Sequence, residues 1–360
     1  MELPVWPKPQ IAYYHDIVSH CPFEMAWYFP CFHTTYFKKI MQYTVAIRTL
    51  GTAGEKYQRL LNSLVAQTVQ PASILVYIAD GYPIPKETIG IEQYVYVKKG
   101  MVAQRALSYD EIETEYILFL DDDVYLPPNG VERLYNALIE HNANVISPDV
   151  FPNAERPFLS SLMMAISGRM VARHDDGKWG YKVMRNSGYS YNKNPRQSVY
   201  RSQTNAGPCF FCKKTDFLSI NFQDELWIDN QAYPLGEDQV MYYKMHLCGL
   251  KIFTIYDSGI VHLDAGSTMM SMDKKRSMIY SDFWFKTVFW HRFIYKPEKN
   301  LILRLYAFVC LTYALLFTLM ISLFKLEFDI LKIKWKSIRS ACTFLKSDYY
   351  CSLPQITKYT

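Results

Sequence analysis

A strand that ends in three acids decides the fold of this chain: Tyr116-Ile117-Leu118-Phe119-Leu120-Asp121-Asp122-Asp123. Bulky, uncharged residues that run directly into acids are typical of a buried parallel strand. Such a strand ends at the carboxyl edge of an α/β sheet, where these proteins bind their ligands. Three adjacent negative charges repel one another, and a divalent cation is the simplest species that would offset the repulsion. The stretch therefore predicts an α/β fold with a metal ion that suits a phosphate-bearing substrate.

The segments around this strand alternate between strand and helix patterns, which predicts a Rossmann-like, mostly parallel central sheet flanked by helices. The expected strands cover 43–48, 74–78, 94–97, 116–120, 208–213 and 251–256, and the expected helices cover 54–67, 102–112, 131–141 and 239–248. Residues 152–206 are polar and weakly periodic, and we interpret them as a substrate-facing region. Residues 1–42 are rich in Pro, Tyr, Phe and His, and we expect an extension packed on or beside the main domain.

Length and composition permit a sizeable core, because the chain has 360 residues and 50% of them are hydrophobic. The formal net charge of +5 is mild but unevenly spread. Its C-terminal basic residues are Lys325, Lys332, Lys334, Lys336, Arg339 and Lys346. A basic tail beside an apolar segment favours an anionic membrane surface, whereas nucleic-acid binding normally needs a stronger basic excess. We therefore expect a membrane contact and no nucleic-acid partner.

The cysteine pattern favours a reducing compartment. Eight cysteines are scattered along the chain without the dense spacing of a secreted disulfide scaffold. Cys209 and Cys212 form a CxxC pair, but no second pair completes a zinc site, and the phenylalanines between them indicate a buried strand. The N-terminus lacks the charged-then-apolar pattern of a signal peptide, so we expect that the protein is not exported.

One segment is apolar enough to enter a membrane. Residues 305–324 contain no charged residue, and twenty helical residues span about 30 Å, the thickness of a hydrocarbon core. A single crossing would place its two basic flanks on opposite sides, against the positive-inside tendency, whereas a monotopic or re-entrant association keeps both cytoplasmic. Aromatic residues interleaved with basic ones at 283–295 have an interfacial composition. A buried helical hairpin or an oligomer interface remains the alternative.

Further motifs accompany the acidic strand in a fixed order. They are Arg48-Thr49-Leu50, Ala79-Asp80-Gly81, the segment Gly100-Met101-Val102-Ala103-Gln104-Arg105-Ala106, Gly236-Glu237-Asp238 and Val261-His262-Leu263-Asp264. Across about 43–265 this ordered set resembles the inverting family 2 glycosyltransferases of bacterial type, which have the GT-A fold. Gln104 and Ala106 depart from the residues usual in that family's corresponding segment.

The resemblance implies transfer of a sugar from a nucleotide diphosphate sugar, with a UDP-sugar as the default, to a hydroxyl of a glycan or lipid-linked acceptor. It implies a single displacement that inverts the anomeric configuration, assisted by Mn²⁺ or Mg²⁺. Residues 43–150 would bind the donor, residues 151–282 would bind the acceptor and carry the catalytic base, and residues 283–360 would form a membrane-associated tail. The setting would be polysaccharide assembly at the cytoplasmic face of the inner membrane, with the enzyme peripheral or monotopic.

The acids and their neighbours receive roles on the same basis. Asp123 is the expected principal metal ligand, Asp121 contacts the metal or its water and the ribose, and His262 completes the metal shell or acts as a structural hydrogen-bonding residue. Donor binding is expected of Arg48, Thr49, Asp80, Arg105, Asp121 and Asp122. For the two arginines, salt bridges are the alternative to phosphate contacts, and for Asp80 the alternative is a turn residue.

Asp238 is the candidate general base, because an acid at a helix start beside other carboxylates can have its proton affinity raised toward working pH. Glu237 would orient or support it. The alternative is that both acids cap the following helix. Trp227 could stack on an acceptor sugar, although Leu226-Trp227-Ile228 is equally typical of a core segment.

Two competing functions fit parts of the pattern. The apolar run into Asp121-Asp122-Asp123 also matches haloacid dehalogenase-like phosphatases, with Asp121 as the nucleophile. That motif usually belongs to the opening strand of its domain, whereas two strand-helix units precede it here. A membrane-associated scaffold without activity is the other alternative, and the acids at 121, 123 and 238 argue against it.

Overall fold

The computed structural model describes residues 41–150, 157–263 and 271–356, and the described chain from Met41 onward forms one compact unit. The predicted extension, residues 1–42, lies almost wholly outside the described residues. The strands are β1 Tyr43–Thr49, β2 Ser73–Ala79, β3 Glu92–Val97, β4 Tyr116–Asp121, β5 Val124–Tyr125, β6 Val145–Pro148, β7 Met170–Arg173, β8 Tyr181–Val183, β9 Tyr189–Asn192, β10 Val199–Ser202, β11 Cys209–Lys213, β12 Ile252–Ile255 and β13 Val261–His262. The helices are α1 Glu55–Val65, α2 Gly130–Glu140, α3 Phe158–Ser167, α4 Lys214–Leu218, η1 Phe222–Asn230, α5 Glu237–Leu247, α6 Met272–Phe289, η2 Trp290–Tyr295, α7 Leu301–Phe324, α8 Phe328–Phe344 and α9 Asp348–Ser352.

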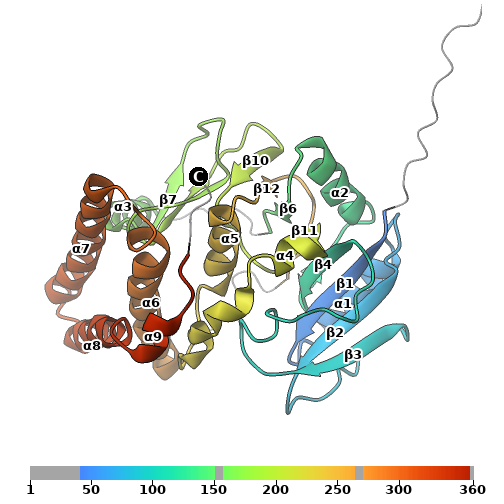
Figure 1. Ribbon diagram of the computed structural model, residues 1–360, viewed down its shortest axis with the longest axis horizontal. Helices are drawn as coiled ribbons and strands as arrows, with labels where there is room; N and C mark the ends of the chain where they lie inside the picture. The colour runs from blue at the N-terminus through green and yellow to red at the C-terminus, as the bar shows by residue number, and fades with distance from the viewer. Residues whose placement is uncertain (1–40, 151–156, 264–270, 357–360) are drawn as a thin grey trace, which may run out of the picture. The chain divides into compact units, whose positions relative to one another are not determined.

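An eight-stranded sheet forms the centre of this unit, in the order β10-β12-β6-β11-β4-β1-β2-β3 (Figure 1). Strands β3, β2, β1 and β4 pair in parallel, as do β6 and β12. Strand β11 pairs antiparallel with both β4 and β6, and β10 pairs antiparallel with β12. The predicted α/β fold with a mostly parallel sheet flanked by helices is therefore confirmed.

Two hydrophobic cores cover the two faces of the sheet. On one face, α1 and α2 pack on side chains such as Val45 and Leu118. On the other face, α5, η1 and the C-terminal helices pack on the residues that alternate with them, such as Ala46 and Phe119. Side chains of a strand point alternately to opposite faces, so an almost continuous apolar strand such as β4 supplies both cores. The carboxyl ends of the parallel strands are left for polar groups.

The acidic triplet lies where the sequence places it, but one predicted helix is absent. Strand β4 ends at Asp121, and Cys209 and Cys212 are buried in β11, as the core interpretation of the CxxC pair expects. The segment predicted as a helix at 102–112 consists of turns instead. Its helical pattern stops at Ala106, and Tyr109 has a positive φ of 54°, a conformation that an α-helix does not accommodate.

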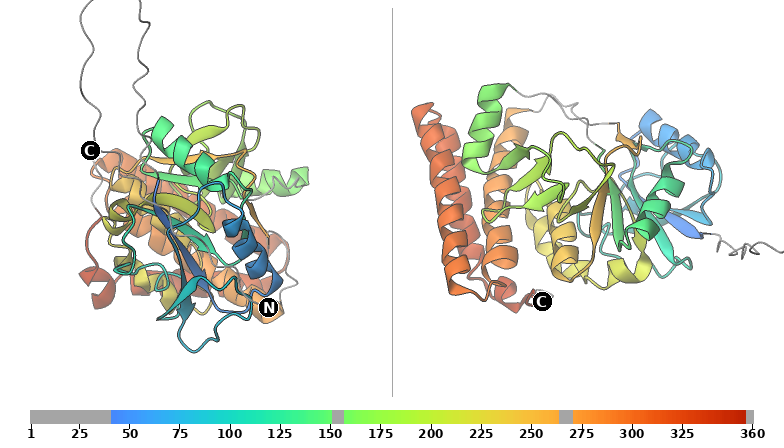
Figure 2. Two further views of the ribbon diagram at one scale, coloured as in Figure 1. Left: turned by 90° about the vertical axis from the view of Figure 1, so that its right-hand side faces the viewer. Right: turned by 90° about the horizontal axis from the view of Figure 1, so that it is seen from above.

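The region after β6 builds a small sheet and a peripheral helix. Strands β7, β9 and β8 form a three-stranded sheet, and α3 packs against β7 and α7. The C-terminal helices α6, α7 and α8 stand beside one another at one side of the unit, with α3 next to α7 (Figure 2). Among the described residues, α7 is the one helix long and apolar enough to cross a membrane, with a mean hydropathy of 2.3 and 22% of its apolar window buried.

Candidate active site

A cavity of about 540 Å³ opens at the carboxyl ends of β1 and β4. It is lined by residues from the ends of these strands, from the loops after β1 and β3, and from the segment before α5. The lining residues are Arg48, Thr49, Leu50, Thr52, Ala53, Lys56, Lys99, Gly100, Met101, Gln104, Asp121, Asp122, Asp123, Pro234 and His262. Motifs separated by more than 200 residues in the sequence thus meet at one edge of the sheet, where parallel α/β folds place their ligands.

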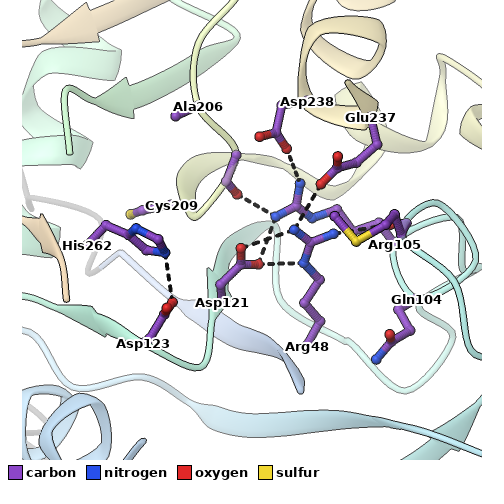
Figure 3. Close-up of polar contacts among 12 residues, drawn as sticks. Arg48, Gln104, Arg105, Asp121, Asp123, Ala206, Cys209, Glu237, Asp238 and His262 are labelled. Carbon is purple, nitrogen blue, oxygen red and sulfur yellow. Dashed lines mark hydrogen bonds and ion pairs between the residues drawn. The ribbon is translucent and has the colours of Figure 1, made fainter. Parts of the chain in front are cut away.

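Asp121 is the centre of a network of buried charges at this edge (Figure 3). The parallel register of β1 and β4 places Arg48 opposite Asp121. Arg48 binds both carboxylate oxygens, through Nε at 2.5 Å and Nη2 at 3.0 Å. Arg105 donates a further hydrogen bond to Oδ1 at 2.9 Å. Burial alone would raise the pKa of Asp121, but the two guanidinium groups lower it below its ordinary value.

These contacts bear on the predicted roles of Asp121 and of the two arginines. Both oxygens of Asp121 accept hydrogen bonds from arginines, and a carboxylate has further lone pairs for a metal ion or its water, so the metal role of Asp121 stays a prediction. Arg48 and Arg105 are buried ion-pair partners rather than exposed ones, with side chains 13% and 3% exposed. Arg48 lines the cavity and can also face a phosphate, whereas Arg105 does not line it.

The two acids at the start of α5 complete the network. Glu237 accepts a hydrogen bond from Arg48 Nη2 at 3.0 Å, and Asp238 accepts one from Arg105 Nη1 at 3.0 Å. Glu237 is almost fully buried, and its burial, together with repulsion from Asp238, raises its pKa to about 7. The Asp238 side chain is 30% exposed and is therefore the member of the pair that an acceptor could reach. The N-cap residue of the helix is Gly236, and both acids lie in its first turn.

Asp123 and His262 form a second pair at the cavity. The short strands β5 and β13 pair antiparallel and place His262 opposite Val124, next to the acid. His262 Nε2 lies 3.0 Å from Asp123 Oδ1, and both residues line the cavity (Figure 3). In the described chain no group of three or more potential metal ligands converges. A carboxylate such as Asp123 together with oxygens of a phosphate substrate is an arrangement that holds Mg²⁺, whereas the His262 imidazole is a nitrogen donor outside that preference.

Asp122 is turned toward β1, where Thr49 Oγ1 donates a hydrogen bond to its Oδ2. Burial raises the pKa of Asp122 to about 6. The hydrogen bond from Thr49 acts to lower this pKa, whereas repulsion from Asp121 and Asp123 acts to raise it. Thr49 Oγ1 also accepts a hydrogen bond from Gly51 N at 2.8 Å, which shapes the loop that follows β1.

The loop after β3 is fixed by residues that sequence reasoning did not identify. Asp229, at the end of η1, accepts hydrogen bonds from the backbone N–H groups of Val102 and Ala103 at 3.0 and 2.9 Å. Gln104, one of the two departures from the family pattern, donates to the Thr49 carbonyl at 3.1 Å. The loop therefore bridges β1 and η1, and it contributes Gly100 and Met101 to the cavity.

The sequence analysis also did not identify two lysines that line the cavity. Lys56 on α1 and Lys99 after β3 line it and can face the phosphates of a donor. Their sequence signal is weak, since lysines on amphipathic helices and strand ends are usually solvated.

Two predicted site residues lie elsewhere. Asp80 is exposed at the end of β2, and it does not line the cavity. Trp227 is fully buried, with its Nε1 bonded to Glu225 at 2.6 Å and its ring packed against Trp284 and Phe285. The role predicted for Trp227 in stacking on an acceptor sugar is therefore wrong in this structure, because both ring faces are covered.

Comparison with known proteins identifies the class. Residues 93–215 match the model of the family described as Glycosyl transferase family 2. The matched residues make up about a third of the chain, and the match confirms the resemblance predicted from its motifs. No curated protein matches the chain significantly.

The chain also shows similarity to solved structures that are distant in sequence. One is GalNAc-T7, crystallised with UDP, GalNAc and Mn²⁺, at 14% identity and a TM-score of 0.47 over 73% of this chain and 53% of that one. Another is TarS of S. aureus, at 15% identity and a TM-score of 0.41 over 69% of this chain and 39% of that one. This chain therefore spans about half, or less, of the length of these two proteins.

Proposed function

We propose that this chain transfers a sugar from a nucleotide diphosphate sugar, with a UDP-sugar as the first candidate, to a hydroxyl of a glycan or lipid-linked acceptor, with inversion. The observation that carries the proposal is the convergence of Arg48, Asp121, Asp123, Asp238 and His262 at one edge of a mostly parallel sheet. The family match, which lies on residues 93–215, supports it.

The site divides the chemistry between two groups of residues. Asp123 and His262 would hold Mn²⁺ or Mg²⁺, which when bound neutralises charge on the departing diphosphate. Asp238 would accept the proton of the acceptor hydroxyl. Arg105 fixes the position of this carboxylate through Oδ1, and Glu237 binds Arg48, which in turn holds Asp121. Residues 43–150 would provide most of the donor site, and residues 151–282 the acceptor site.

We further propose that α7 lies along a membrane surface instead of crossing it. Large apolar side chains on one face are exposed to solvent in this unit, among them Leu305, Phe308 and Leu316 at 62%, 50% and 56%. A stripe on the opposite side packs on the protein from Ala307 to Ser322, both of which are fully buried. A crossing would carry the neighbouring helix α8 into hydrocarbon together with its lysines, at a high cost. An interfacial position exposes only the apolar face.

The test is the variant Asp238→Asn, assayed with a panel of nucleotide sugars by release of the nucleoside diphosphate in the presence of Mn²⁺. We expect turnover to fall by roughly 10²- to 10⁴-fold, the usual contribution of a general base. The donor should still raise the unfolding temperature when Mn²⁺ is present, because Asp238 is not a predicted donor ligand. Asp110→Asn, at an exposed position outside the cavity, is the matched control. Unchanged turnover in Asp238→Asn would remove this residue from the role of base.

A further inference from the structure

A second and larger cavity, of about 1000 Å³, lies away from the candidate active site. It is enclosed by the hairpin between β8 and β9, by β10, by the C-terminal end of α5 and by helices α3 and α7. It shares no lining residue with the first cavity. His246 of α5 lines this cavity. Asp238, which is bound by Arg105 at the first site, lies eight positions earlier in the same helix. This separation corresponds to a rise of about 12 Å along the helix axis.

One side of this cavity is strongly cationic. Lys182, Arg185, Arg201 and Lys251 line it, and Glu298 is the one carboxylate among its described lining residues. In the described part of the chain, none of these four cations has a carboxylate within ion-pair distance. The ammonium of Lys182 and the guanidinium of Arg201 each lie 5.7 Å from the centre of the same Trp179 ring. Both cations line the cavity, where an anionic group would be attracted to them.

The other side of the cavity is apolar and continues onto the exposed faces of two helices. Ile166 of α3 and Cys310 of α7 line it, and the Arg185 guanidinium lies over the ring of Tyr306 on α7 at 5.5 Å. Helix α3 also exposes Phe158 and Leu159, at 81% and 68%. Helices α3 and α7 are in contact (Figure 2). Cations therefore lie at the edge of an apolar surface. An anionic phospholipid carries the matching groups, a negative phosphate next to apolar acyl chains.

We propose that this cavity binds the phosphate group of an anionic lipid, whose acyl chains contact the exposed apolar faces of α3 and α7. The inference rests on the membrane association proposed above, but not on the proposed transfer reaction. The proposal adds two elements to that membrane association. One is α3, which lies within the region 152–206 that the sequence analysis describes as polar. The other is a headgroup site formed by Arg185 and Arg201. The volume of the cavity lies within the range of sites that hold small organic ligands.

The experiment measures binding of the full chain to vesicles by flotation. Vesicles of phosphatidylcholine alone are compared with vesicles that also contain phosphatidylglycerol. We expect wild type to bind both and to prefer the anionic ones. Each cation near an anionic surface contributes about five-fold in affinity, so Arg185→Gln with Arg201→Gln should lower binding to anionic vesicles by roughly 25-fold. Binding to pure phosphatidylcholine should not change.

The matched control is Lys86→Gln with Lys98→Gln, two exposed lysines outside both cavities, which removes the same charge. Equal losses in the two double variants would show attraction by net charge alone and would overturn the headgroup site. Wild type that binds both vesicle types equally would overturn it as well, with membrane association intact. Wild type that binds neither would refute the membrane association itself.

Soluble glycerol phosphate separates a lipid from a free phosphate as the ligand. It is added in a thermal-shift assay to wild type and to both double variants. A shift that depends on Arg185 and Arg201, combined with vesicle binding that does not depend on them, would assign the cavity to a soluble phosphate compound and overturn the lipid proposal. Lys182→Gln serves as a further single variant if the double variant does not fold.

Discussion

Replacing Glu237 by glutamine should make the protein more stable at alkaline pH and leave it nearly unchanged at acid pH. Burial and the neighbouring Asp238 raise the pKa of Glu237 from 4.5 to about 7 in the folded chain. Folded protein then binds the proton more tightly than unfolded protein does, so the free energy of unfolding falls as pH rises from about 4.5 to about 7. A shift of this size corresponds to about 3 kcal/mol. Glutamine has no proton to lose, and Arg48 keeps both of its bonds to Asp121 in the variant.

Urea unfolding of both proteins between pH 4.5 and pH 8 provides the measurement. The difference in unfolding free energy should be small at the acid end and should approach about 3 kcal/mol in favour of the variant above pH 7. Asp122, whose pKa is raised to about 6, contributes with the same sign, but it is present in both proteins and cancels in the difference. Glu113→Gln, at an exposed position outside the site, is the matched control. Parallel curves for wild type and Glu237→Gln would refute the reasoning, as would a variant that gains stability at acid pH instead.

Three further substitutions test other parts of the structure. Asp123→Asn should weaken Mn²⁺ binding, measured by titration calorimetry with UDP present, by at least about 10-fold; equal affinity would exclude Asp123 as a ligand. Glu225→Gln removes the carboxylate that Arg292 binds at 2.7 and 2.8 Å and should lower the free energy of unfolding by about 3–5 kcal/mol, so an unchanged urea midpoint would contradict the assigned ion pair. Gly100→Ala would place a methyl group 2.2 Å from Asp229 Oδ2 and break its backbone bonds, at a cost of about 1–3 kcal/mol; unaltered stability and donor binding would show that the loop adjusts freely.

The strands that form the site were predictable because their apolar runs are long and end abruptly. Strands β1, β2 and β4 lie within about one residue of their predicted bounds. Helix α1 was predictable from its periodic apolar face, whereas α5 is buried on most of its sides. The segment at 102–112 has a similar pattern but is not an α-helix, because its helical bonding stops at Ala106 and Tyr109 has a positive φ of 54°. Asp229 of a distant element binds the backbone N–H groups of Val102 and Ala103, a contact that no local pattern could reveal.

The roles of the acids were less predictable than their positions. Three adjacent carboxylates suggest a shared cation, yet each has a different partner: Asp121 binds arginines, Asp122 binds Thr49 and Asp123 lies beside His262. Successive residues at a strand end point in different directions, so neighbours in sequence need not share a ligand. Only the pairing of β5 with β13, two short strands without a clear pattern, brings His262 to the site.

Helix α5 is held by charges from both sides, which links the acids at its start to the C-terminal helices. At its start, Asp238 is bound by Arg105. Two turns later, Lys244 lies 2.9 Å from Glu225, the carboxylate that also binds Arg292 in η2. Buried ion pairs tolerate little displacement, since an unpaired charge in a core is costly. The position of the proposed base therefore depends on the C-terminal helices that carry the apolar surface, although none of their residues lines the catalytic cavity.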